Sequence, residues 1–207
     1  AQQANFEKDR FESTFFQLLR THNQIVKDIS LPEREYPFDS GDLSEKAQRQ
    51  LFDESPEVFL RRGRSCFDVF YKKFEELFEE TAEERKWGDI ESSEEGKVGW
   101  VYNNWFADRK SELNHYFSHL AQLISFIHRS DVEDKEFYID LVIAQMSVPE
   151  LKLFFYHVNL MKDNTEHRHL RDAYEVLGEY TFFEQIDRRS LAHDQHYQLN
   201  REALGME

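Results

Sequence analysis

FYIDLVIAQMSVPELKLFFYHVNLM, residues 137–161, is the most apolar long stretch of the chain and carries a helix boundary at its centre. Ser147 and Glu150 form a capping box, in which the serine oxygen accepts a backbone N–H of the first turn and the glutamate carboxylate accepts the Ser147 N–H. Pro149 suits that turn because its missing N–H would have no partner there. The stretch therefore predicts two core helices that meet at a tight corner.

Apolar residues on both sides of this corner indicate that the two helices are buried. After the corner they recur at spacings of three and four, the pattern of a helix with one buried face. These residues are Leu151, Phe154, Phe155 and Val158. Before the corner, residues 138–143 leave almost no polar face, so we expect the first helix to be covered on most sides.

The composition also favours helices. The 207 residues include 19 Phe and 9 Tyr but only 7 Gly and 4 Pro, which argues against turn-rich all-β folds and glycine-loop nucleotide folds. A net charge of −15 opposes non-specific binding to nucleic acid or anionic lipid. Cys66 is the single cysteine, so it can form neither an internal disulfide nor a cysteine-based zinc site. No apolar run reaches the roughly 18 residues of a membrane span, so we expect this chain itself to be soluble.

Periodic patterns elsewhere predict the remaining helices. A seam with heptad-like spacing runs through Phe11, Phe15, Leu18, His22, Ile25 and Ile29. Further helices are expected over about 65–85, about 100–128 and about 170–180, where Phe182, Phe183 and Ile186 could extend the last helix. An acidic loop is expected at 86–99 and a short helix at 44–51. The sequence predicts one all-α domain over 1–207, a bundle of about five or six helices. Its parts are a connecting helix at 1–29, a loop region at 30–56, a helical core at 57–187 and a polar tail at 188–207.

Three groups of residues are candidates for chemistry. Arg109 and His115 are separated by five residues, a spacing that loosely resembles the R-x(4–6)-H pair of HEPN ribonucleases, where arginine would steady a phosphate and histidine would move a proton. Arg61, Arg62 and Arg64 flank Gly63 just before a predicted helix, so they could bind an anion or could be solvated arginines that balance nearby acids.

The third group is a possible metal site. Glu112 with His115 and Glu166 with His169 both form E-x-x-H, the motif that builds di-metal sites in four-helix bundles. His115 and His119 could also act as a pair of ligands. The second motif lies in a polar run and no further buried glutamates suggest themselves, so we predict no metal and no cofactor.

Several blocks of the sequence resemble, in order, the putative phage abortive infection family, AbiC-like. They are FESTFFQLLRTHNQIV at 11–26, GRSCF at 63–67, LNHYFSHL at 113–120 with FI at 126–127, and YIDLVIAQMSVPELKLFFY at 138–156. The chain departs from the family pattern at Ser118, Ile143 and His157. Its polar motif positions here are His22, Asn23, Arg64, His115, Tyr116, Gln145 and Glu150.

The resemblance implies a bacterial antiphage effector or sensor, built as two N-terminal membrane helices, a connecting helix and a cytoplasmic domain. It brings no established catalytic residues. The chain lacks an initiator methionine and its helical pattern starts near Ala1, so we expect upstream helices to anchor it to the cytoplasmic face of the inner membrane. The phage or host trigger is not indicated.

The first seam allows two interpretations, and the function allows two as well. The seam could join a second copy in a homo-oligomer, or it could pack inside the domain against Phe67, Phe70 and residues 151–158. The domain could act by binding or assembly. The alternative is a HEPN-like ribonuclease that uses Arg109 and His115.

Overall fold

The computed structural model describes residues 2–32, 60–83, 93–161, 168–193, 195–201 and 204–206. These residues contain six α-helices: α1 (Gln2–Asp28), α3 (Ser65–Glu83), α4 (Glu94–Arg129), α5 (Lys135–Ile143), α6 (Val148–Met161) and α7 (Arg168–Leu177). Two 3₁₀ turns, η3 (Arg188–Ser190) and η4 (His196–Leu199), follow them. The prediction of a helical domain with five or six helices is confirmed.

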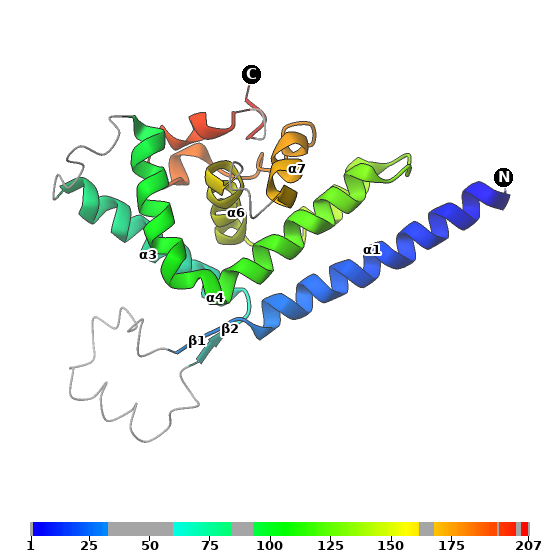
Figure 1. Ribbon diagram of the computed structural model, residues 1–207, viewed down its shortest axis with the longest axis horizontal. Helices are drawn as coiled ribbons and strands as arrows, with labels where there is room; N and C mark the ends of the chain where they lie inside the picture. The colour runs from blue at the N-terminus through cyan, green and yellow to red at the C-terminus, as the bar shows by residue number, and fades with distance from the viewer. Residues whose placement is uncertain are drawn as a thin grey trace.

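Helix α4 is the longest element, and the other helices are arranged around it (Figure 1). It bends midway, so its first arm runs beside α3 while its second arm runs beside α1. It also contacts α5, α6 and α7. Its buried residues extend from Val98 to Ile127, so α4 is the element that brings the two ends of the chain onto one core.

The beginning of α4 corrects one prediction. The loop expected at 86–99 ends by Ser93, because the Ser93 hydroxyl accepts the Gly96 N–H at 3.1 Å and starts the helix there. Glu94 and Glu95 follow in the first turn, where the positive end of the helix dipole stabilises negative charge. Gly96 and Gly99, which suggested a loop, therefore lie within the first turns of a helix.

The corner between α5 and α6 has the predicted capping box. Glu150 Oε2 accepts the Ser147 N–H at 2.7 Å, and Ser147 Oγ accepts the Glu150 N–H at 3.4 Å. The Gln145 and Met146 amides bond back to Val142 and Ile143, closing α5. The apolar residues after the corner are buried as predicted, so this part of the fold follows directly from the sequence.

A small hairpin was not predicted. Strands β1 (Ser30–Pro32) and β2 (Leu60–Arg62) pair antiparallel, with Leu31 opposite Arg61. Gly63 then turns the chain into α3 with a φ of 65°, a conformation that favours glycine. Strands of three residues are too short to show a periodic pattern, which is why the sequence did not predict them. The region predicted as a loop from residue 30 begins with β1. The predicted helix at 44–51 lies outside the described residues.

The seam of α1 packs inside the domain, although against different helices than expected. Phe11 stacks on Phe126 of α4 at 5.1 Å, and Phe15 meets the Tyr138 ring of α5 edge-on at 5.1 Å. The Tyr138 hydroxyl also donates to Glu12 at 2.8 Å. The partners are therefore α4 and α5, and Phe11 and Phe15 are buried by this chain itself.

The C-terminal segment packs on the core, whereas the sequence predicted only a polar tail at 188–207. Leu191, His196 and Leu204 are buried, and the Tyr71 hydroxyl of α3 donates to the Ser190 carbonyl at 2.9 Å. Single apolar residues in a polar run carry no periodic signal, so this packing could not be predicted.

The capping box gives a first test of the fold. Replacing Ser147 by Ala removes the acceptor of the Glu150 N–H and should lower the free energy of unfolding by roughly 0.5–2 kcal/mol. The long 3.4 Å hydrogen bond places the expected loss in the lower half of that range. Denaturant unfolding would measure it, with Ser13→Ala on the exposed side of α1 as the control. Equal stability of Ser147→Ala and the wild type would contradict the capping box.

Candidate functional site

A group of polar side chains lies where α1, the start of α3, the middle of α4 and the start of α6 meet. Arg64 Nε is 3.1 Å from Glu150 Oε2, and Arg64 Nη2 donates to Asn23 Oδ1 at 3.0 Å. The Tyr116 hydroxyl donates to Glu150 Oε1 at 3.2 Å. Asn23 Nδ2 lies 3.5 Å from Gln145 Oε1. We call His22, Asn23, Arg64, Tyr116, Gln145 and Glu150 the polar junction.

Glu150 is the centre of the polar junction. Its side chain is fully buried, whereas Arg64 is 37% exposed. Burial raises the pKa of Glu150 above its ordinary value, although the Ser147 amide, the Arg64 charge and the Tyr116 hydroxyl all oppose this rise. These three groups partly offset the cost of burying a carboxylate, and one edge of the arginine stays at the surface.

His22 lies against this centre and is neutral. Its ring is 5.1 Å from the Tyr116 ring and 5.9 Å from the His119 ring. Burial lowers the pKa of His22 to about 3, with the nearby His119 and Arg64 adding to the effect. Within the described part of the chain, neither ring nitrogen of His22 has a hydrogen-bond partner. His22 is thus a buried polar group beside a charged pair, an arrangement that costs stability.

The sequence blocks of the resemblance meet at this point. The first block supplies His22 and Asn23, GRSCF supplies Arg64, LNHYFSHL supplies Tyr116, and the last block supplies Gln145 and Glu150. Of the polar motif positions, only His115 lies outside the polar junction. The sequence had indicated a separate structural role for each, and nothing in it showed that they form one group.

The three candidate arginines do not act alike. Arg64 is engaged by Glu150 and Asn23, so its charge is already partly neutralised. Arg61 and Arg62 lie on β2, and Gly63 makes the predicted turn. The first turn of α3 contains Asp68, which disfavours an anion there. Anion binding by these arginines stays a prediction.

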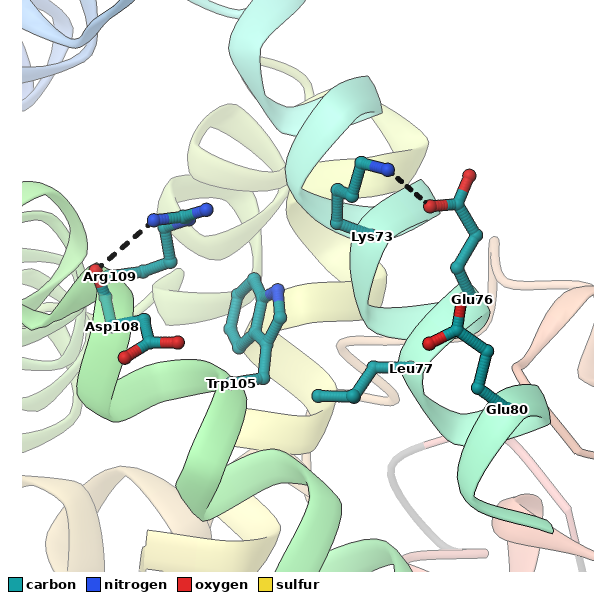
Figure 2. Close-up of a pocket in the computed structure, with 7 residues that line it drawn as sticks. All are labelled: Lys73, Glu76, Leu77, Glu80, Trp105, Asp108 and Arg109. Carbon is teal, nitrogen blue, oxygen red and sulfur yellow. Dashed lines mark hydrogen bonds and ion pairs between the residues drawn. The ribbon is translucent and has the colours of Figure 1, made fainter. Parts of the chain in front are cut away.

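Arg109 and His115 lie on different sides of α4. Arg109 lines a hollow of about 220 Å³ between α3 and α4, and His115 does not (Figure 2). His115 is six positions after Arg109, so at 3.6 residues per turn the two side chains point about 120° apart. Glu76, Glu80 and Asp108 also line the hollow, and these acids would repel a phosphate. The structure therefore does not bring the two residues together around one substrate position.

Of the di-metal pattern that the sequence analysis considered and set aside, the structure describes only Glu112 and His115 completely. The Ser111 hydroxyl donates to Glu112 at 2.7 Å, and His115 is exposed. Glu166 and the side chain of His169 lie outside the described part of the chain. A different set, Glu94, His193 and His196, does come within reach of one another. The sequence analysis missed it because these residues are far apart and match no spaced motif.

Comparison with known proteins gives one match. The family described as "Putative phage abortive infection protein" matches residues 108–191. The predicted resemblance is confirmed over that range, and the match implies a role in antiphage defence. It includes Tyr116, Gln145 and Glu150 of the polar junction. No curated protein and no solved structure matches the chain. Among the described residues, no helix has both the length and the apolar character needed to cross a bilayer.

The raised pKa of Glu150 predicts a pH dependence of stability. The folded protein holds the Glu150 proton at pH values where the unfolded chain has lost it. Stability from this proton is therefore complete below the ordinary value of 4.5 and is lost as the pH rises through the raised pKa. Each unit of difference between the two pKa values corresponds to about 1.4 kcal/mol.

Glu150→Gln removes the titration, so the stability of wild type relative to this variant should fall as the pH rises above 4.5. Denaturant unfolding from about pH 4 to about pH 7 would measure the difference. Glu133→Gln at an exposed position controls for the loss of one charge. A difference that stays constant across this range would show that Glu150 titrates alike in the folded and unfolded chains.

Proposed function

We propose that the chain is the cytoplasmic domain of an antiphage effector or sensor that acts by binding and assembly. In this proposal, helices upstream of α1 hold it at the cytoplasmic face of the bacterial inner membrane, and α1 passes a signal between membrane and domain. Support comes from the family match over 108–191, from the wider resemblance of the sequence blocks, and from the two different faces of α1. The last of these carries the proposal.

The inner face of α1 is held by the domain. Its aromatic residues pack on α4 and α5, and Asn23 bonds Arg64, which in turn pairs with Glu150. A shift of α1 would therefore expose apolar rings and also take one partner from Arg64. Because both changes occur together, α1 and the polar junction are suited to behave as one unit.

Helix α1 carries two exposed phenylalanines, Phe6 on its outer face and Phe16 at the flank of that face. Phe6 is 68% exposed and Phe16 is 47% exposed. At about 100° per residue, Phe6, Gln17 and Gln24 lie on the side of α1 opposite Phe15 and His22. The blue N-terminal part of α1 also extends beyond the neighbouring helices (Figure 1). This face is available to another helix.

A second copy of the chain is the occupant that we propose for this face. Two copies held on one membrane have a high effective concentration, so a small contact through Phe6, with Phe16 at its flank, can be sufficient. The seam that includes Phe11 and Phe15 is buried within each copy, so in our proposal it holds α1 to its own domain while the outer face makes the contact between copies.

Cysteine crosslinking in cells tests the assembly. We expect Gln17→Cys or Gln24→Cys, each in a Cys66→Ser background of the full-length protein, to crosslink two copies before or during infection. Glu133→Cys, at an exposed position in the connection between α4 and α5, should not crosslink. Phe6→Ser should weaken both crosslinking and phage protection, because it removes an apolar contact without touching the buried seam.

The controls separate assembly from simple loss of folding. Each variant is compared with wild type for expression and thermal stability. Cys66 is buried, so its replacement by serine can itself lower stability, and Cys66→Ser alone must still protect cells. A protein that protects cells while never crosslinking at either outer position acts without this contact. The family role in defence would stand, and assembly through α1 would be discarded.

Loss of Arg109 and His115 should not abolish defence. We expect the double variant Arg109→Ala and His115→Ala to keep phage protection close to that of wild type, since the two side chains face different directions and the hollow beside Arg109 is acidic. Plaque counts after infection measure protection, with expression and folding verified. Loss of protection together with loss of RNA cleavage by the purified protein would support the ribonuclease alternative instead.

A further inference from the structure

We propose that Glu94, His193 and His196 form a binding site for a divalent transition metal ion, with Zn²⁺ as the ion that suits them best. Each residue offers one ligand atom, and these atoms lie within 4.8 Å of one another. Imidazole nitrogen and carboxylate oxygen are common zinc ligands, and two histidines with one glutamate is a known donor set. The site lies outside the family match at 108–191, so it does not rest on that match.

The three residues converge from two parts of the chain. Glu94 is the first residue of α4, and His193 and His196 lie before and at the start of η4. The red C-terminal segment runs beside the beginning of α4 (Figure 1), and α4 contacts η4. His193 Nδ1 is 4.0 Å from Glu94 Oε2. In tetrahedral zinc sites with bonds of about 2.0–2.1 Å, neighbouring ligand atoms are about 3.4 Å apart, so small side-chain rotations would bring these atoms to bonding distance.

His196 provides the independent observation that points to a ligand. Its side chain is buried, and within the described residues its Nε2 atom has no hydrogen-bond partner. A buried imidazole nitrogen without a partner costs stability. A metal ion between His196, His193 and Glu94 would supply the missing partner.

The other ring nitrogen of His196 is already held in the way that metal ligands require. Nδ1 is 2.8 Å from the hydroxyl of Tyr156, which also accepts the Ala192 N–H at 3.0 Å. In the tautomer that donates from Nδ1 to Tyr156, the lone pair lies on Nε2. Metal-binding histidines usually donate their second nitrogen in this manner, which fixes the ring and its tautomer. The Phe78 ring, 4.8 Å away and edge-on, further limits rotation.

Glu94 supplies the negative charge. Its carboxylate forms an ion pair with the Lys97 ammonium, which favours the charged form. Lys97 bonds Oε1, which leaves Oε2 for the histidines. His193 Nδ1 accepts a long hydrogen bond of 3.3 Å from the Gln195 amide, and an ion bound through Nδ1 would replace it. Three protein ligands leave a fourth position for water or another ligand.

Zinc titration of the metal-free protein tests the site. After treatment with a chelator, calorimetry with Zn²⁺ should show one equivalent bound by wild type. Changes to outer-sphere partners of zinc already cost 10–100-fold in affinity, so His193→Ala and Glu94→Gln should each weaken binding at least about tenfold. Both side chains are partly exposed, which makes these variants safer for folding than a change at buried His196.

Matched controls address binding elsewhere on the protein. Glu95→Gln removes a charge from the same helix end, and His115→Ala removes an exposed histidine distant in sequence; both should bind Zn²⁺ as wild type does. Co²⁺ in place of Zn²⁺ should give the strong visible absorption of a tetrahedral site, and His193→Ala should lose it. The proposal is overturned if wild type binds no zinc, or if His193→Ala and Glu94→Gln bind it as tightly as wild type.

Discussion

The buried carboxylate of Glu150 connects three helices of this structure. It caps the start of α6 through the Ser147 amide, pairs with Arg64 ahead of α3 and accepts a hydrogen bond from Tyr116 of α4. Removing Arg64 would cost more than the pair contributes, because the Glu150 charge left behind is buried and cannot reach water. Glu150 thus fixes three helices relative to one another, and through Arg64 and Asn23 it reaches a fourth, α1.

This constraint explains how α1 can be both part of the core and a candidate for transmitting a signal. Its seam is covered by α4 and α5. Asn23 of α1 accepts a hydrogen bond from Arg64, which is partly open to solvent. Apolar packing is tolerant of small shifts, whereas an ion pair and its hydrogen bonds depend on distance and direction. A displacement of α1 would therefore break the hydrogen bonds of the polar junction before it disrupts the apolar packing.

The C-terminal segment forms a separate arrangement at the N-terminal end of α4. Tyr156 of α6 holds His196 and the Ala192 amide, so the segment is fixed to α6 as well as to the beginning of α4. A bound ion at Glu94, His193 and His196 would tie the start of α4 to the last turns of the chain. Defence by binding and a zinc-stabilised fold are compatible, because the two sites are built from different residues.

The sequence by itself determined the helices and the corner at Ser147, because periodicity and capping are local properties that neighbouring residues specify. It also indicated the family, since long blocks such as residues 138–156 carry more information than composition. The tertiary structure decided which residues meet. His22, Arg64 and Glu150 form one group, Arg109 and His115 do not, and Glu94 approaches His193 and His196. The bend of α4 and the packing of the C-terminal segment bring residues that are distant in sequence close together. This long-range geometry arises from burial of the whole aromatic core, and local residue spacing does not predict it.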